Sequence, residues 1–190
     1  MKKGQLITYK QTNLATLHIQ NELYSVGLWN EDSRLQEVTV YHCALPVFSI
    51  PDADGFFFHG ESLLYKLLGY EIGHIYIPKF VISNLFNQNR GSLRAIIRHE
   101  FGHAFAHYYP ELIIDNVGFE QVFGGHYFEV TSSNMPSSSY VSDYAKTMPM
   151  EDFAETFRVY LMYKGICPIG FSKDLKRKWR FIEKAINKIN

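Results

Sequence analysis

The chain has 190 residues, a length that suits one domain with its own hydrophobic core. Its formal net charge is zero at pH 7, so we expect neither nucleic acid nor a membrane as a partner. Cys43 and Cys167, the only cysteines, are far apart in the sequence, which argues against a disulfide framework and against a zinc site built from thiolates. No segment has the length and apolar character of a signal peptide or a membrane span. These features predict a soluble, cytoplasmic, monomeric protein, with export as a secreted effector as the alternative.

The first half of the chain predicts a small sheet. Residues 1–35 show no clear pattern, whereas residues 38–42 alternate between apolar and polar side chains, and residues 47–50 are rich in β-formers. A turn at residues 51–55 leads into a short buried strand at Phe56-Phe57-Phe58.

A short helix and another strand are expected next. Residues 61–68 read as a helix ended by Gly69, and residues 73–78 read as a strand. Because proline donates no backbone hydrogen bond, Pro78 favours the edge of the sheet for this strand. An edge strand can hold an extended peptide by β-augmentation, although an ordinary structural strand explains the pattern equally well.

The most informative segment is His99-Glu100-Phe101-Gly102-His103, an H-E-x-x-H pattern. On a helix, the two imidazoles lie one turn apart and can both reach one zinc ion. Glu100 lies about 100° further round the helix, where it can act as general base towards a water molecule activated by the metal. The pattern therefore predicts His99 and His103 as zinc ligands and Glu100 as a catalytic residue.

The surrounding residues favour a helix that packs in a core. Cap residues precede it at 89–92, Pro110 ends it, and an apolar stripe lies opposite the histidines. That stripe consists of Leu93, Ile97, Phe101, Ala104, Phe105 and Tyr108. The simpler alternative is that the histidines lie on the solvated face of an amphipathic helix. After it, residues 110–123 predict helical turns ending at Gly124, residues 126–130 a short strand, and residues 131–139 a loop.

Zinc needs a third protein ligand, and a second helix, predicted at residues 148–161, offers candidates. His107 does not qualify through the longer metzincin motif, because the chain has Ala106 and Tyr109 where that motif requires Gly and His. Glu151 and Glu155 are four residues apart on one helix face, an arrangement of like charges that a nearby cation would stabilise. Two solvated carboxylates on a wet face would be the alternative.

These two segments together resemble the gluzincin type of zinc metallopeptidase, in particular the catalytic domain of anthrax lethal factor and related small bacterial metallopeptidases. The resemblance covers H-E-x-x-H, a tyrosine seven residues before a glutamate, and the run E-x-F-A-E-x-F-R that begins at Glu151. It implies that Glu151 is the third zinc ligand, that Glu155 orients a ligand histidine, and that the Tyr144 phenol stabilises the oxyanion. Which of Glu151 and Glu155 contacts the metal stays open, and Asp143 is a third candidate.

The C-terminal segment, residues 172–189, predicts an amphipathic helix. One face carries Leu175, Trp179, Ile182, Ile186 and Ile189, and the other is basic, with Lys173, Lys176, Arg177, Lys178, Arg180, Lys184 and Lys188. We expect this helix to pack on the same domain, while a membrane-surface or partner-binding helix is the alternative. The predicted organisation is a catalytic domain at 1–170 followed by this helix at 171–190.

The sequence thus predicts an α+β protein of zincin-like fold, with a small mixed sheet, an active-site helix and a mostly helical C-terminal half. The predicted function is that of a zinc metalloendopeptidase that hydrolyses protein or peptide substrates, with Zn²⁺ as its one cofactor. A zinc-bearing scaffold or binding module of the same fold, without useful turnover, is the alternative, and a structural domain without metal is the third hypothesis.

Overall fold

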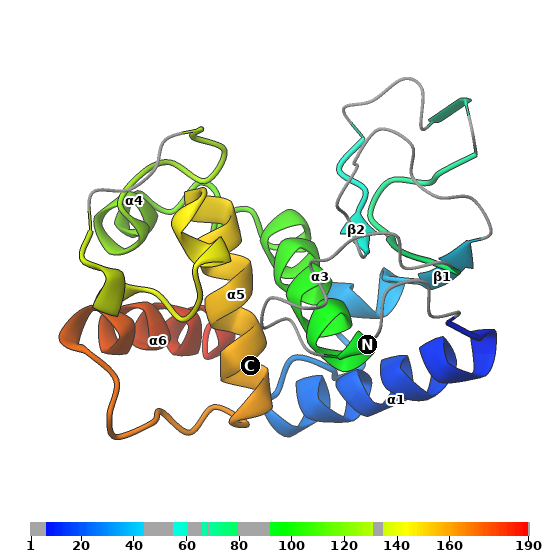
Figure 1. The fold of residues 1–190 in the computed structure, drawn as a ribbon, viewed down its shortest axis with the longest axis horizontal. Coiled ribbons are helices and arrows are strands. Elements are labelled where there is room, and N and C mark those ends of the chain that lie inside the picture. The colour runs from blue at the N-terminus through cyan, green and yellow to red at the C-terminus, as the bar shows by residue number, and fades with distance from the viewer. Residues whose placement is uncertain are drawn as a thin grey trace.

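The computed structural model describes residues 7–43, 55–60, 66–67, 69–79, 92–130 and 135–189. Within these ranges, five α-helices accompany a three-stranded mixed sheet, which confirms the α+β class. Helix α3 (Leu93–Tyr108) occupies the middle of the molecule (Figure 1). The sheet and α1 (Tyr9–Ser25) lie on one side of it, and α4 (Val117–Phe123), α5 (Pro149–Met162) and α6 (Lys173–Ile186) lie on the other.

The sheet contains β1 (Val40–Cys43), β2 (Phe56–Phe57) and β3 (Ile75–Pro78) in the order β1-β3-β2. Strand β3 pairs in parallel with β1, where Val40 lies opposite Ile75, and antiparallel with β2, where Phe56 lies opposite Tyr76. The three strands were expected, but the edge position of the strand ending at Pro78 was wrong, because β3 is central. Pro78 is tolerated there because it is the last residue of its strand.

Among the described strands, β2 forms the edge that contacts α3. The predicted strand at residues 47–50, most of the turn at 51–55 and most of the helix at 61–68 lie outside the described residues.

Helix α1 falls in the region where the sequence showed no clear pattern. Thr8 and Gln11 form a capping box at its start, in which each side chain accepts a hydrogen bond from the backbone of the other residue. Its buried face includes Ala15, Ile19 and Leu23. The exposed apolar residues Leu14, Leu17 and Tyr24 obscure the helical spacing of these buried residues in the sequence, which explains why the helix was missed.

Helix α3 begins and ends as expected. The Ser92 side chain accepts a hydrogen bond from the Ala95 amide, and the helix ends at Tyr108, ahead of Pro110. Every residue from Ala95 to Ala106 is buried, so this is a central helix rather than an amphipathic surface helix. A buried ion pair fastens α1 to it, since the Arg98 guanidinium donates two hydrogen bonds of 2.6 Å to the Glu22 carboxylate.

Helices α3 and α5 approach each other closely at Gly102 and Ala154. A Cβ atom on Gly102 would lie only 2.8 Å from the Ala154 Cα, closer than two carbon atoms can pack. The smallest residues of the two helices therefore meet, and the short distance between the helix axes brings the faces carrying His99 and Glu151 together.

The C-terminal half is helical, as predicted, with two corrections. Residues 126–130 form a turn instead of a strand, after α4 ends at Gly124 in the left-handed conformation (φ +82°). Lys178, expected on the basic face of α6, is fully buried and its Nζ donates hydrogen bonds of 2.6 Å to Asp152 and to the Ser139 carbonyl. The apolar face of α6 packs against α4 and α5. None of the helices in the described part is long and apolar enough to cross a bilayer.

Candidate metal centre

Helix α3 presents the two histidines of the H-E-x-x-H motif towards α5. His99 and His103 are 2% and 4% exposed, and their Nε2 atoms lie 3.1 Å apart. The solvated-face alternative therefore does not describe this helix. One helical turn separates the two residues, and the surrounding core holds both rings so that the same nitrogen of each points to a common place.

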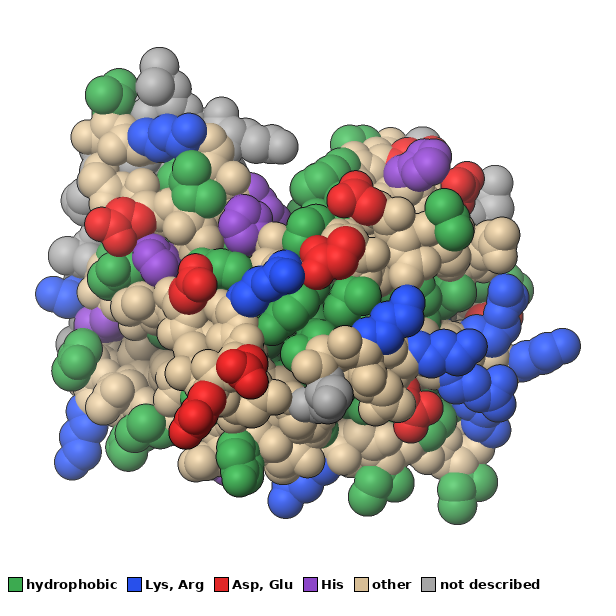
Figure 2. Space-filling model, turned by 180° about the vertical axis from the view of Figure 1, so that it is seen from behind, with side chains coloured by type: hydrophobic (Ala, Val, Ile, Leu, Met, Phe, Trp, Pro, Cys, Tyr) green, Lys and Arg blue, Asp and Glu red, His purple; other side chains and the backbone are tan. Residues whose placement is uncertain are grey.

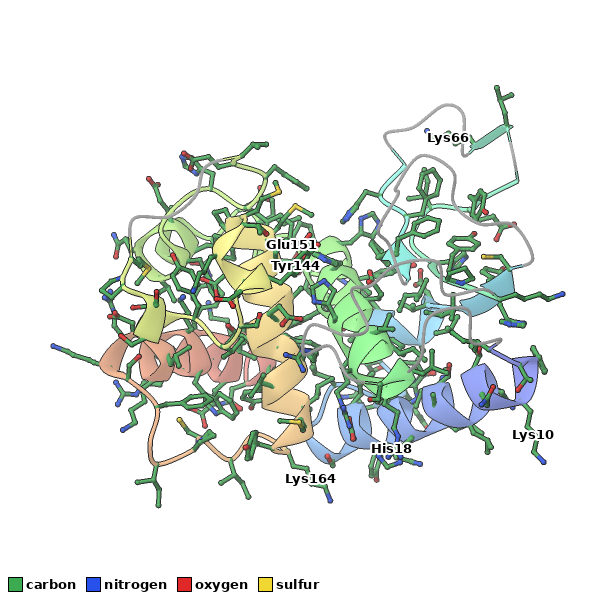
Figure 3. The ribbon with its side chains drawn as sticks, in the orientation of Figure 1. Lys10, His18, Lys66, Tyr144, Glu151 and Lys164 are labelled. Atoms are coloured by element: carbon green, nitrogen blue, oxygen red, sulfur yellow. The ribbon has the colours of Figure 1, made fainter. Side chains whose placement is uncertain are left out.

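Helix α5 supplies a carboxylate at that place. Glu151 lies in its first turn, after Pro149, and its Oε2 atom lies 3.0 Å from His99 Nε2 and 3.6 Å from His103 Nε2. One ligand atom of each residue falls within 4.8 Å of the other two. Figure 3 shows Glu151 and Tyr144 where α5 faces α3.

The two imidazole nitrogens and the Glu151 oxygen would be better satisfied by a metal ion than by their contacts with one another. Glu151 Oε2 is buried and has no hydrogen-bond partner, although it lies 3.0 Å from His99 Nε2. A buried carboxylate oxygen without a donor is costly, and a cation between the three atoms would remove that cost. Two imidazole nitrogens and one carboxylate oxygen are a common donor set of catalytic zinc sites, which leave the fourth position open.

Glu155 holds His99 from the other side of the ring. Its Oε1 lies 2.9 Å from His99 Nδ1, and it is fully buried. Arg158 donates hydrogen bonds to both carboxylate oxygens, at 3.0 and 2.9 Å, and Ser142 donates one of 2.7 Å. Burial opposes ionisation of Glu155, but His99 and Arg158 lower the pKa of its carboxyl below the usual value. A charged Glu155 can accept the Nδ1 proton of His99, and in the neutral imidazole this directs the Nε2 lone pair towards the cluster.

His103 has a different partner. Its Nδ1 atom lies 3.2 Å from the phenol oxygen of Tyr127, which is 2% exposed. Burial and the carboxylates of Glu151 and Glu100 raise the pKa of Tyr127 well above its usual value, so the phenol stays neutral. No sequence pattern indicated this role, because Tyr127 reaches His103 from the turn that follows α4.

Tyr144 lies on the same side of the cluster as α5. It begins the short 3-10 helix η4 (Tyr144–Lys146), which packs against α5, and its ring centre is 5.8 Å from that of His99. Asp143, its neighbour, points elsewhere: its side chain is 93% exposed and pairs with Lys146. The group that could hold a metal therefore includes Glu151 and leaves out Asp143.

Glu100 lies beside the cluster on α3. It is 4% exposed, and its carboxylate forms no hydrogen bond with another residue that the structure describes. A buried carboxylate without a hydrogen-bond partner next to two imidazoles is available for proton transfer.

A second residue missed from the sequence is His59, which follows β2. Its ring centre lies 5.8 Å from that of His103 and 6.3 Å from that of Phe128. Burial and the nearby His103 lower the pKa of His59 to about 4, so the ring is neutral near pH 7. In the space-filling view, histidine side chains lie at the side of a hollow between two lobes (Figure 2).

Comparison with known proteins agrees with this chemistry. A family model described as "Putative zinc-binding metallo-peptidase" matches residues 67–184, which include His99, His103 and Glu151. Neither the comparison with curated proteins nor the one with solved structures gave a match. Because the matched span is more than half of the 190 residues, the chain belongs to this family of zinc-binding metallopeptidases.

Proposed function

We propose that the protein is a zinc-dependent endopeptidase of the gluzincin type, in which His99, His103 and Glu151 hold the metal. The observation that carries this proposal is the convergence of three buried ligand atoms, one of which has no hydrogen-bond donor. The resemblance to the lethal factor catalytic domain is consistent with it, because that resemblance implies the same three residues as ligands. In this proposal, residues 1–170 are the catalytic domain and residues 171–190 are its C-terminal helix.

Zinc bound at this place would lower the pKa of the attacking water and polarise the scissile carbonyl. Glu100 takes a proton from that water and later gives it to the departing amine, a double role that suits a carboxylate held beside the site. The Tyr144 phenol donates a hydrogen bond to the oxygen that gains negative charge in the transition state. Glu155 and Tyr127 keep the two imidazoles oriented by accepting their Nδ1 protons.

The substrate in this proposal is an extended stretch of a protein or peptide. Strand β2 is the described sheet edge that contacts α3, so it is better placed than the central strand β3 to pair with such a stretch. His59 follows directly on β2, beside His103, where substrate would pass.

The test is hydrolysis of a peptide library by the zinc-loaded protein, with and without a chelator, compared with Glu100→Gln. We expect Glu100→Gln to keep stoichiometric zinc while its turnover falls by about 10²- to 10⁴-fold, the usual contribution of general acid–base catalysis. Glu31→Gln, at an exposed position, is the matched control and should retain full activity. Zinc binding without cleavage by the unmodified protein would instead identify a zinc-bearing scaffold.

A further inference from the structure

A groove with a volume of about 430 Å³ lies between α4 and α6, on elements that do not contribute metal ligands. The apolar side chains that line it are partly or fully buried and include Leu112, Val122 and Phe181. Its cationic side chains are exposed, and they are Arg177, Arg180, Lys184 and Lys188. The groove thus combines an apolar interior with a basic margin.

The helical repeat of α6 produces this arrangement. Arg177 and Lys184 are seven residues apart on α6, so they share one stripe, while Trp179 and Ile182 point into the core. Lys188 follows the end of α6 at Ile186. The whole chain has no net charge, so this concentration of cations is local rather than a result of basic composition. Lys and Arg side chains gather at the end of the molecule that α6 forms (Figure 2).

The cations have no acidic partner in the described part of the chain. None of the four takes part in a salt bridge there, and Arg177 makes one long hydrogen bond, of 3.5 Å, to the Gln121 carbonyl. Arg180 and Lys184 are four residues apart on α6. A pair of like charges at this spacing repels slightly, and an anionic partner in the groove would reduce that repulsion.

We propose that this groove binds an acidic segment of a protein partner, which places an apolar side chain against Phe181 and carboxylates beside the four cations. A concave site favours a peptide over a membrane, because a flat bilayer cannot reach side chains such as Leu112 inside the groove. A nucleic-acid backbone would use the cations but leave the apolar interior unfilled. The groove is separate from the metal cluster, so this inference goes beyond the proposed function.

The experiment measures binding of a fluorescent peptide made of glutamates around one central leucine. We expect binding to the full-length protein that weakens as salt rises, because the charge pairs lie at an exposed margin. The double reversal Arg177→Glu with Lys184→Glu should weaken binding by about tenfold or more, since it replaces two attractions by two repulsions. The pair Lys10→Glu with Lys173→Glu makes the same change of net charge at exposed sites that do not line the groove, and should leave binding unchanged.

Several outcomes would overturn the proposal. They are no binding of the acidic peptide, equal loss in both double variants, or unchanged binding when the central leucine is replaced by serine. Tighter binding of a DNA oligonucleotide or of phosphatidylserine vesicles, lost in the groove variant, would assign the groove to that partner instead. If the reversal variant does not fold, as judged by circular dichroism, Arg177→Gln with Lys184→Gln replaces it. Because binding is measured directly, the result does not depend on whether the protein cleaves peptides.

Discussion

Nδ1 of His103 lies 3.2 Å from the phenol oxygen of Tyr127, whereas Nδ1 of His99 faces the carboxylate of Glu155. The two histidines of one motif therefore have unequal partners, one neutral and one charged. A charged acceptor forms the stronger hydrogen bond and raises the basicity of the imidazole more. We therefore expect Nε2 of His99 to be the more basic of the two candidate ligand nitrogens and Nε2 of His103 the less basic.

Tyr127→Phe should lower zinc affinity by about tenfold, at the lower end of the range for residues that orient metal ligands. The ring fills the same space, so folding should change little, while His103 loses the acceptor for its Nδ1 proton. Glu155→Gln should cost more affinity, because a charged acceptor is lost. Competition for zinc with a chromophoric chelator measures both, with exposed Tyr24→Phe as the control. An affinity of Tyr127→Phe equal to that of the unmodified protein would remove this orienting role.

Glu151→Ala should abolish stoichiometric zinc, because two imidazoles alone make an incomplete site. Asp143→Ala should retain it, since that carboxylate is exposed and pairs with Lys146. Metal analysis of the two purified variants after dialysis gives the answer. The reverse result, with zinc kept by Glu151→Ala and lost by Asp143→Ala, would assign the third ligand to Asp143.

Tyr144→Phe should keep its zinc and lower kcat by about 10²-fold, the cost of removing one hydrogen-bond donor from a developing oxyanion. KM should change less, because the bond strengthens only in the transition state. Tyr163→Phe, which alters a half-exposed phenol at the end of α5, is the control for steady-state kinetics. A change confined to KM would give Tyr144 a role in substrate binding alone.

Lys178→Met should destabilise the fold by about 3 to 5 kcal/mol, because it leaves the Asp152 carboxylate buried without its cation. Burial raises the pKa of Asp152 to about 7 and lowers that of Lys178, while each group favours the charged form of the other. Adding Asp152→Asn should restore part of the loss. Urea unfolding measures all variants, with exposed Lys173→Met expected to lie within about 0.5 kcal/mol of the unmodified protein. Equal stability of Lys178→Met would show that the pair contributes nothing.

The sequence predicted the residues whose relative position a single helix fixes. His99 and His103 are one turn apart whatever surrounds them, and the same holds for Glu151 and Glu155. That these two pairs meet depends on how α3 packs on α5, and the spacing along the chain carries no information about packing. The expectation that the two pairs form one site came from the resemblance to gluzincins and not from the periodicity of the sequence.

Contacts between distant segments were the part that sequence patterns missed. Tyr127 reaches His103 from a turn, and Lys178 is buried because Asp152 lies opposite it on another helix. A lysine beside an apolar seam normally lies in solvent, so its pattern predicted the wrong face. The order of strands in the sheet likewise depends on pairing, which placed β3 in the centre.

The close approach of Gly102 to Ala154 has a consequence for the choice of ion. With no flexible side chain between the two backbones, the ligand atoms can move apart only by rotation of the ligand side chains or by separation of α3 from α5. Zinc forms bonds of about 2.0 to 2.2 Å to nitrogen and oxygen, while calcium requires about 2.3 to 2.6 Å and more oxygens than Glu151 provides. Gly102 and Ala154, which are not among the candidate ligands, would then contribute to discrimination by ionic radius.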